Sequence, residues 1–275
     1  MIVYLVKMTT CALLLYAIYV LLIEKEKMHY FKRIYLLASL VFSLTVPLVV
    51  LTLNIGFPQM PATITGWNTI VEVTDTRPVI NETNTYADYL LPILSVYVLI
   101  ASFFLFRLLK NSWKMLAQGR KNACKDFYGA KIVLVDEESV PYSFGFYIFI
   151  NRDEYNNGQI PCEIMLHERT HVRQRHTYDI LFIELLIAFS WFNPVFYLYR
   201  NKIRQNHEFL ADDAVIERDR ELIPLYQTLL INHIPQQKNI YFTSNFHFNY
   251  LITKKRIIMM TKTTSKKWYG AKVLH

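Results

Sequence analysis

The sequence predicts a mainly α-helical membrane protein, in which transmembrane helices precede a small α+β domain. Hydrophobic residues make up 53% of the 275 residues and charged residues 19%, whereas soluble domains usually carry roughly 25% charged residues. The apolar residues also gather in long runs rather than at helical or strand spacing. We therefore expect residues 1–109 to form a membrane domain and residues 110–275 to lie on its cytoplasmic side.

Three apolar runs are long enough to cross a bilayer as helices, which takes roughly 20 residues. They lie at about residues 2–23, 34–57 and 89–109. The first run is too long for the core of a signal peptide, contains Lys7 and has no small-residue cleavage site after it, so we expect it to be retained. The membrane domain therefore has three predicted transmembrane helices, with membrane lipid around them.

The net charge of +8 is spread beside the apolar runs, which is where membrane topology places basic residues, so we expect no direct nucleic-acid partner. One group lies between the first two runs and another follows the third, whereas residues 58–88 contain only one basic residue. The positive-inside rule then predicts a multi-pass protein of the inner membrane, with everything after Arg107 in the cytoplasm. The two groups are Lys25, Lys27, Lys32 and Arg33, and Arg107, Lys110, Lys114, Arg120, Lys121 and Lys125.

A fourth apolar run at residues 180–199 has no obvious placement. It contains Glu184 and the pair Asn193-Pro194, and the basic residues at 200–204 favour a cytoplasmic position for both of its ends. Three interpretations stay open: a re-entrant hairpin bent near residues 191–194, a buried or interfacial helix of the inner domain, and a fourth span.

The region between the third span and residue 166 has the pattern of a small folded domain. Residues 131–135 and 146–150 are rich in β-branched and aromatic side chains and predict two short strands, with loops at 136–139 and 141–145. The strand near 146–151 is either an edge strand that binds an extended substrate or an ordinary core strand. The isolated cysteines, Cys11, Cys124 and Cys162, indicate a reduced or membrane-buried setting.

The segment 167–171 contains the pattern H-E-x-x-H on a stretch compatible with a helix. Residues four apart share one helix face, so His167 and His171 can present their ring nitrogens to one metal ion. Zinc suits such a pair because it lowers the pKa of a bound water and keeps one coordination position open. Glu168, beside the metal, can act as the general base on that water.

A third ligand must lie elsewhere in the chain. A metzincin site would need Gly at position 174 and His at 177, but the sequence has Gln174 and Thr177. Glu208 is favoured over a merely solvated carboxylate, because it gives the two-His, one-Glu set of gluzincins. Asp212, one turn further, can accept a hydrogen bond from a ligand histidine. His171 precedes residues 180–199 and Glu208 follows them, and both must then reach the same ion. This argues against a single crossing of the bilayer by residues 180–199.

The other polar residues near this motif are less informative. His176 and Asp179 fit equally well as groups that support the ligands or as polar residues at a helix–membrane boundary. His207 points to a different helix face from Glu208, so we expect a surface histidine. No residue can be identified as the electrophile that a peptidase would use to stabilise its oxyanion.

Taken in order, the motifs resemble those of the BlaR/MecR membrane metallopeptidases, which are antirepressor sensor-transducers of β-lactam resistance. The resemblance implies a gluzincin-type domain at the inner face of the membrane, with His167, His171 and Glu208 as zinc ligands and Glu168 as catalytic base. In that family, an outer carboxy-terminal domain senses the signal; no such domain precedes His275, so the signal stays open. The motifs lie at 141–145, 167–171, 191–194, 208–212 and 255–260.

Two functions remain to be weighed. The first is a zinc endopeptidase that cleaves a protein substrate, with a transcriptional repressor and the chain itself as the candidates implied by the resemblance, and a homodimer as one assembly. The alternative is a non-catalytic signalling module with a structural metal site. A transporter is disfavoured because only Lys7 and Glu184 are ionisable within the apolar runs.

Overall fold

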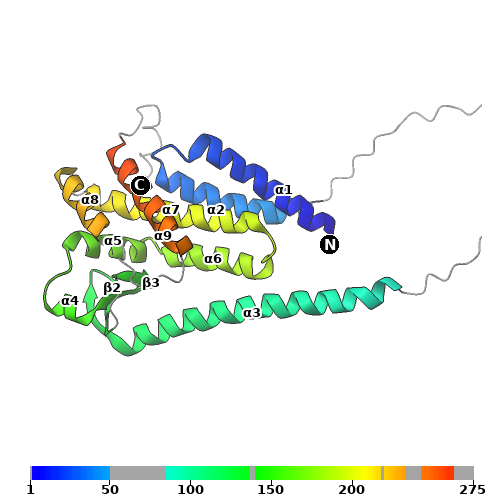
Figure 1. Ribbon diagram of the computed structural model, residues 1–275, viewed down its shortest axis with the longest axis horizontal. Helices are drawn as coiled ribbons and strands as arrows, with labels where there is room; N and C mark the ends of the chain where they lie inside the picture. The colour runs from blue at the N-terminus through cyan, green and yellow to red at the C-terminus, as the bar shows by residue number, and fades with distance from the viewer. Residues whose placement is uncertain (1, 50–84, 137–139, 218–219, 233–242, 263–275) are drawn as a thin grey trace, which may run out of the picture.

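The computed structural model describes residues 2–49, 85–136, 140–217, 220–232 and 243–262 (Figure 1). Within these ranges the chain is mostly helical, with one small sheet, as the sequence predicts. Among the described residues, three helices are long and apolar enough to cross a membrane: Val3–Ile23, His29–Leu48 and Leu91–Asn122. The second begins earlier than the predicted residue 34, and residues 50–57 of that prediction lie outside the described residues.

The first two helices form an antiparallel hairpin. Helix α1 (Ile2–Ile18) continues into the π-helical turn η1 (Tyr19–Ile23), and α2 (His29–Thr45) ends in the 3₁₀ turn η2 (Val46–Leu48). The polar start of α2 is buried, with Lys32 only 1% exposed, and its ammonium group donates a hydrogen bond to the carbonyl of Glu24 at 2.8 Å. This contact satisfies a carbonyl at the end of the preceding helix, which has no partner within the helix itself.

Helix α3 (Thr85–Asn122) is a single helix of 38 residues, about 57 Å long at 1.5 Å per residue. It therefore continues well past residue 109, where the apolar run ends. In Figure 1 it extends from the sheet along the length of the molecule. Because strand β1 begins at the next residue, α3 connects the apolar region directly to the sheet.

The apolar run at 180–199 folds as a helical hairpin rather than as one helix. Helix α6 (His176–Phe189) and helix α7 (Pro194–Ile216) are joined by a turn at residues 190–193. Asn193 caps α7 because its side-chain oxygen accepts a hydrogen bond from the amide of Val195 at 3.0 Å, and Pro194 occupies a first-turn position that needs no amide donor. The turn is thus encoded locally.

This hairpin packs against α1 and α2 in one four-helix core (Figure 1). The tip of the hairpin lies deep among the apolar helices: Asn193 donates a hydrogen bond to the Thr9 hydroxyl of α1 at 3.0 Å, and the Tyr97 hydroxyl of α3 donates to the carbonyl of Phe189 at 2.7 Å. The buried residues of this core are Met8, Ala12, Tyr19, Leu36, Leu40, Ile183, Ile187, Val195, Phe196, Tyr199 and Ile203.

In the part of the chain that the structure describes, the sheet has four strands in the order β1-β2-β4-β3, and only its central pair is parallel. Strands β2 (Ala130–Val135) and β4 (Tyr147–Asn151) match the two predicted strands. β4 lies between β2 and β3, so the suggestion that this strand forms an edge is wrong. The edge on that side is the short strand β3 (Tyr142–Phe144), and β1 (Ala123–Phe127) forms the other edge.

The remaining helices surround the sheet and α7. Helix α4 (Arg152–Asn156) follows β4, and α5 (Cys162–Arg173) packs across the sheet and against α7. After η3 (Arg220–Leu222), helices α8 (Ile223–Asn232) and α9 (Thr243–Thr261) pack beside α7. The Lys262 side chain, just after α9, donates to the carbonyl of Lys25 at 3.1 Å, so α9 contacts the α1–α2 turn.

Candidate metal centre

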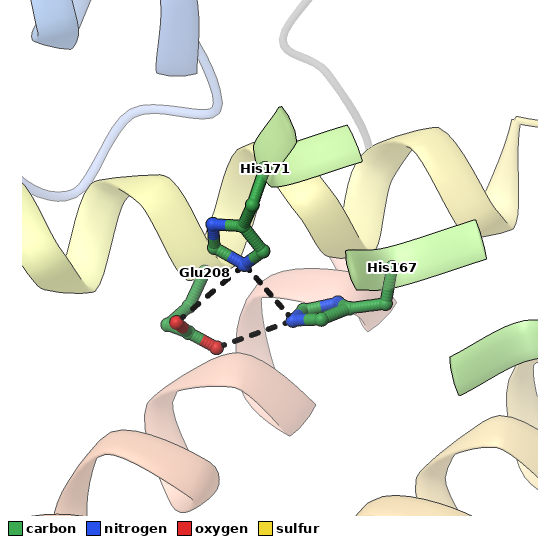
Figure 2. A group of neighbouring side chains, drawn as sticks. All are labelled: His167, His171 and Glu208. Carbon is green, nitrogen blue, oxygen red and sulfur yellow. Dashed lines mark hydrogen bonds and ion pairs between the residues drawn. The ribbon is translucent and has the colours of Figure 1, made fainter. Parts of the chain in front are cut away.

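Helices α5 and α7 bring the three predicted ligands together (Figure 2). The Nε2 atoms of His167 and His171 lie 3.2 Å apart. Each also faces the Glu208 carboxylate, at 3.4 Å from His167 Nε2 to Oε2 and 3.8 Å from His171 Nε2 to Oε1. Among the described residues, no other group of three or more His, Cys, Asp or Glu side chains has its ligand atoms within 4.8 Å of one another.

The spacing of these atoms fits a zinc ion. Zinc bonds of about 2.0–2.2 Å at tetrahedral angles place neighbouring ligand atoms roughly 3.3–3.5 Å apart, close to the three distances measured here. Two imidazoles and a carboxylate are also the donor set of many catalytic zinc sites, in which a fourth position holds water or substrate. The side chains thus fit the implied cofactor in both chemistry and geometry.

The opposite side of the His167 ring has two oxygen partners. Its Nδ1 lies 3.2 Å from the Asp212 carboxylate and 2.9 Å from the Tyr226 hydroxyl, and Tyr226 itself donates to Asp212 at 2.8 Å. Because Tyr226 uses its proton on Asp212, its oxygen can accept the Nδ1 proton of His167. That leaves the Nε2 lone pair of His167 free to bind a metal. Asp212 thus lies beside a predicted ligand histidine, whereas no sequence pattern points to Tyr226.

Arg256 of α9 joins the ligand Glu208 to Asp212. Its guanidinium makes two hydrogen bonds to Asp212, at 2.8 and 2.6 Å, and lies 2.9 Å from Glu208 Oε2. Burial alone would raise the pKa values of both carboxyl groups, but Arg256 and His167 lower them; the pKa of Glu208 falls well below its usual value. Both groups therefore stay ionised and cannot block the site with a proton.

Glu168 lies next to the first ligand and contacts the sheet. Its half-buried side chain lies next to Ser143 of the edge strand β3. Burial raises the pKa of Glu168 to about 7, and the charge of Glu208 contributes in the same direction, whereas Ser143 lowers the pKa of the carboxyl group. A carboxylate with a pKa near neutrality is suited to accept a proton and return it.

The three polar residues with uncertain roles are all buried. His176, Asp179 and His207 are 3%, 9% and 3% exposed, so the expectation that His207 is a surface histidine is wrong. The His207 ring stacks on His176, with ring centroids 4.0 Å apart, and its Nε2 bonds to Asp179 at 2.9 Å. Asp179 also pairs with Arg33 of α2 at 2.7 Å. Since Nδ1 of His176 lies 2.9 Å from Nδ1 of His171, the cluster links a candidate ligand to the candidate transmembrane helix α2.

Comparison with known families gives a match to one of them. Residues 1–260 match the family described as BlaR1 peptidase M56, and the search of curated proteins finds no match. The matched region includes the candidate transmembrane helices, the sheet and the three converging side chains, and it confirms the resemblance to BlaR/MecR proteins. The chain is therefore a member of the BlaR1 peptidase M56 family of membrane metallopeptidases.

Proposed function

We propose that this protein is a membrane-embedded zinc endopeptidase that cleaves a cytoplasmic regulatory protein, with its own chain as a second substrate. The observation that carries the proposal is the convergence of His167, His171 and Glu208 beside Glu168, in a member of a peptidase family. A non-catalytic structural site is disfavoured because such sites are closed by four protein ligands, whereas the described residues bring together three.

The residues around the site have separate roles in peptide hydrolysis. When bound, zinc supplies a Lewis acid that lowers the pKa of water and polarises a carbonyl. Glu168 accepts a proton from the attacking water and returns it to the leaving amide nitrogen. Arg256 and Asp212 hold Glu208 and His167 in place, so the ligands need not reorganise during the reaction.

Strand β3 provides a surface for an extended substrate. It is an edge of the sheet in the described part of the chain, and its Ser143 contacts Glu168. A peptide paired with this edge through main-chain hydrogen bonds would pass beside the catalytic carboxylate. Such pairing recognises backbone rather than side chains, so it suits an endopeptidase acting on an unfolded segment of a protein.

The α6–α7 hairpin enters the membrane and returns to the same side. Its tip contacts Thr9, which lies about 21 Å from the end of η1 at Ile23 along a helix rising 1.5 Å per residue. The apolar core of a bilayer is about 30 Å thick, so the tip reaches roughly two-thirds of the way across. A re-entrant hairpin therefore leaves His171 and Glu208 on one side, and the basic residues beside the apolar runs favour the cytoplasm for that side.

Labelling of Cys162 tests this orientation. Cys162 is exposed and begins α5, the helix that carries His167 and His171. In a Cys11→Ser, Cys124→Ser background, a membrane-impermeant maleimide should label Cys162 in inverted inner-membrane vesicles and leave it unlabelled in intact spheroplasts. Labelling from the outside would place the metal centre in the opposite compartment and overturn the orientation.

Metal removal tests the activity. Detergent-purified protein should cleave an unfolded protein such as casein, lose that activity after treatment with a zinc chelator, and recover it when one equivalent of zinc is added. Self-cleavage should follow the same pattern and is measured by gel electrophoresis of the purified chain. Cleavage that persists after zinc has been removed to below a few per cent occupancy would rule out the proposal.

A further inference from the structure

The ligand His171 has an unusual partner on the side of its ring away from the metal site. Its Nδ1 lies 2.9 Å from Nδ1 of His176, whereas the corresponding nitrogen of His167 faces a carboxylate and a hydroxyl. If Nε2 of His171 binds a metal, its Nδ1 must carry the proton. His176 Nδ1 must then be the unprotonated acceptor, and its own proton lies on Nε2.

The next contacts agree with this proton assignment. His176 Nε2 lies 2.9 Å from the side-chain oxygen of Gln174, an atom that can only accept, so His176 donates to it. The amide nitrogen of Gln174 then donates to the hydroxyl of Tyr30 on α2 at 3.0 Å. Metal binding at His171 thus fixes the direction of every hydrogen bond from the ligand to α2.

The position of Gln174 is held from the same helix. Arg33, also on α2, donates to the backbone carbonyl of Gln174 at 2.8 Å and to the carboxylate of Asp179 at 2.7 Å. Gln174 lies at the joint between α5 and α6, where Arg175 adopts a left-handed conformation with φ of 56°. A non-glycine residue in that conformation needs support from its surroundings, and α2 provides it.

We propose that His176 is a positioning residue for the metal centre, which fixes the tautomer and ring orientation of His171 and links this ligand through Gln174 to helix α2. The inference rests on the proposed zinc site. His176 suits the role because it is 3% exposed and sandwiched against His207, the two rings being parallel within 2°. The nearby carboxylate of Asp179 bonds to His207 and Arg33, so its negative charge is balanced by the Arg33 guanidinium.

Two substitutions at one position separate positioning from packing. His176→Leu removes the acceptor and puts an apolar side chain in place of the ring, and it should weaken zinc binding by about 10–100-fold, as losses of such supporting groups do. His176→Asn places its amide oxygen nearly where Nδ1 lies, since both atoms are two bonds from Cβ, and should restore affinity close to wild type. Gln174→Met removes the side-chain bond to Tyr30 and leaves the backbone bond from Arg33, so it should weaken binding by less than about tenfold.

Zinc affinity is measured by chelator competition on detergent-purified full-length protein, and the visible spectrum of the Co²⁺-substituted site reports ligand orientation. His176→Leu should shift that spectrum and His176→Asn should not. Thermal unfolding of the zinc-free proteins shows whether a variant is merely destabilised. The inference about His176 is overturned if the Leu variant has wild-type affinity and spectrum, or if Asn binds as weakly as Leu; an unaffected Gln174→Met overturns the link to α2. A wild-type protein that binds no zinc would instead refute the proposed function.

Discussion

Glu168→Gln protein should cleave substrate about 100–10,000-fold more slowly than wild type, the range expected for loss of a general base, and should still bind one zinc per chain. Glutamine keeps the shape of the side chain and its contact with Ser143 but cannot accept a proton at neutral pH. The metal ligands His167 and His171 are unchanged. Cleavage rates and zinc content are measured on the same detergent-purified preparations.

Glu163→Gln provides the matched control. Glu163 lies in the first turn of the same helix, α5, and is not part of the metal centre, so the variant should cleave at the wild-type rate. A zinc-loaded Glu168→Gln protein that still cuts would assign the base to another residue. A wild-type protein that binds zinc and never cuts, in any membrane environment, would favour the signalling module with a structural metal.

Glu208→Ala should lose zinc almost completely. Loss of a supporting hydrogen-bond partner weakens metal binding by about 10–100-fold, and loss of a ligand itself should exceed this, since only the two histidines would remain. Arg256 would keep its two bonds to Asp212, so α9 should stay in place and the fold should survive. Zinc content after dialysis against a weak chelator, measured by atomic absorption, gives the result directly.

Asp213→Ala is the control for this variant. Asp213 lies on the same helix but pairs with Lys27 and His29 of the α1–α2 region at 3.9 and 3.6 Å, away from the ligands. It should retain zinc like wild type. Full zinc occupancy in Glu208→Ala would show that Glu208 is not the third ligand, and the gluzincin assignment would then be wrong.

The parts of the molecule that follow a local rule could be predicted from the sequence. The spacing of His167 and His171 puts two nitrogens on one helix face whatever the rest of the chain does. The long apolar runs predict α1, α2 and α3 by length alone, and β2 and β4 follow from their β-branched and aromatic side chains. Glu208 and Asp212 are four residues apart on one helix, so a helix that brings Glu208 to the two histidines also brings Asp212 close to them.

Residues that reach the site from distant segments could not be predicted in this way. Arg256 contacts Asp212 across 44 residues and Tyr226 contacts His167 across 59, and no short pattern encodes those distances. The resemblance did single out residues 255–260, which was the only signal for Arg256. The prediction for His207 is wrong because it assumes that the helix face opposite Glu208 is exposed to water. In the structure, α7 is covered by α2, α5, α6 and α9.

The same limitation affects the sheet and the hairpin. The composition of residues 146–150 predicts a strand but does not reveal that β3 pairs beside it, because a three-residue strand is too short to show alternation. For residues 180–199, the apolar composition predicts burial but does not distinguish the lipid bilayer from the interior of the protein. The packing of α6 and α7 against α1 and α2 depends on the whole bundle.

Helix α7 extends from the tip of the hairpin, deep within the apolar bundle, to the candidate metal centre. From Pro194 to Glu208 it spans about 21 Å at 1.5 Å per residue, and Tyr199 anchors its early turns to the carbonyl of Ala12 at 3.2 Å. It therefore works mechanically as a lever: a tilt of about 3° about its inner-bundle end moves Glu208 by about 1 Å. Because this one helix carries both the Asn193 cap at the hairpin tip and the candidate ligand Glu208, a reorientation of the hairpin within the bundle would move the carboxylate relative to His167 and His171.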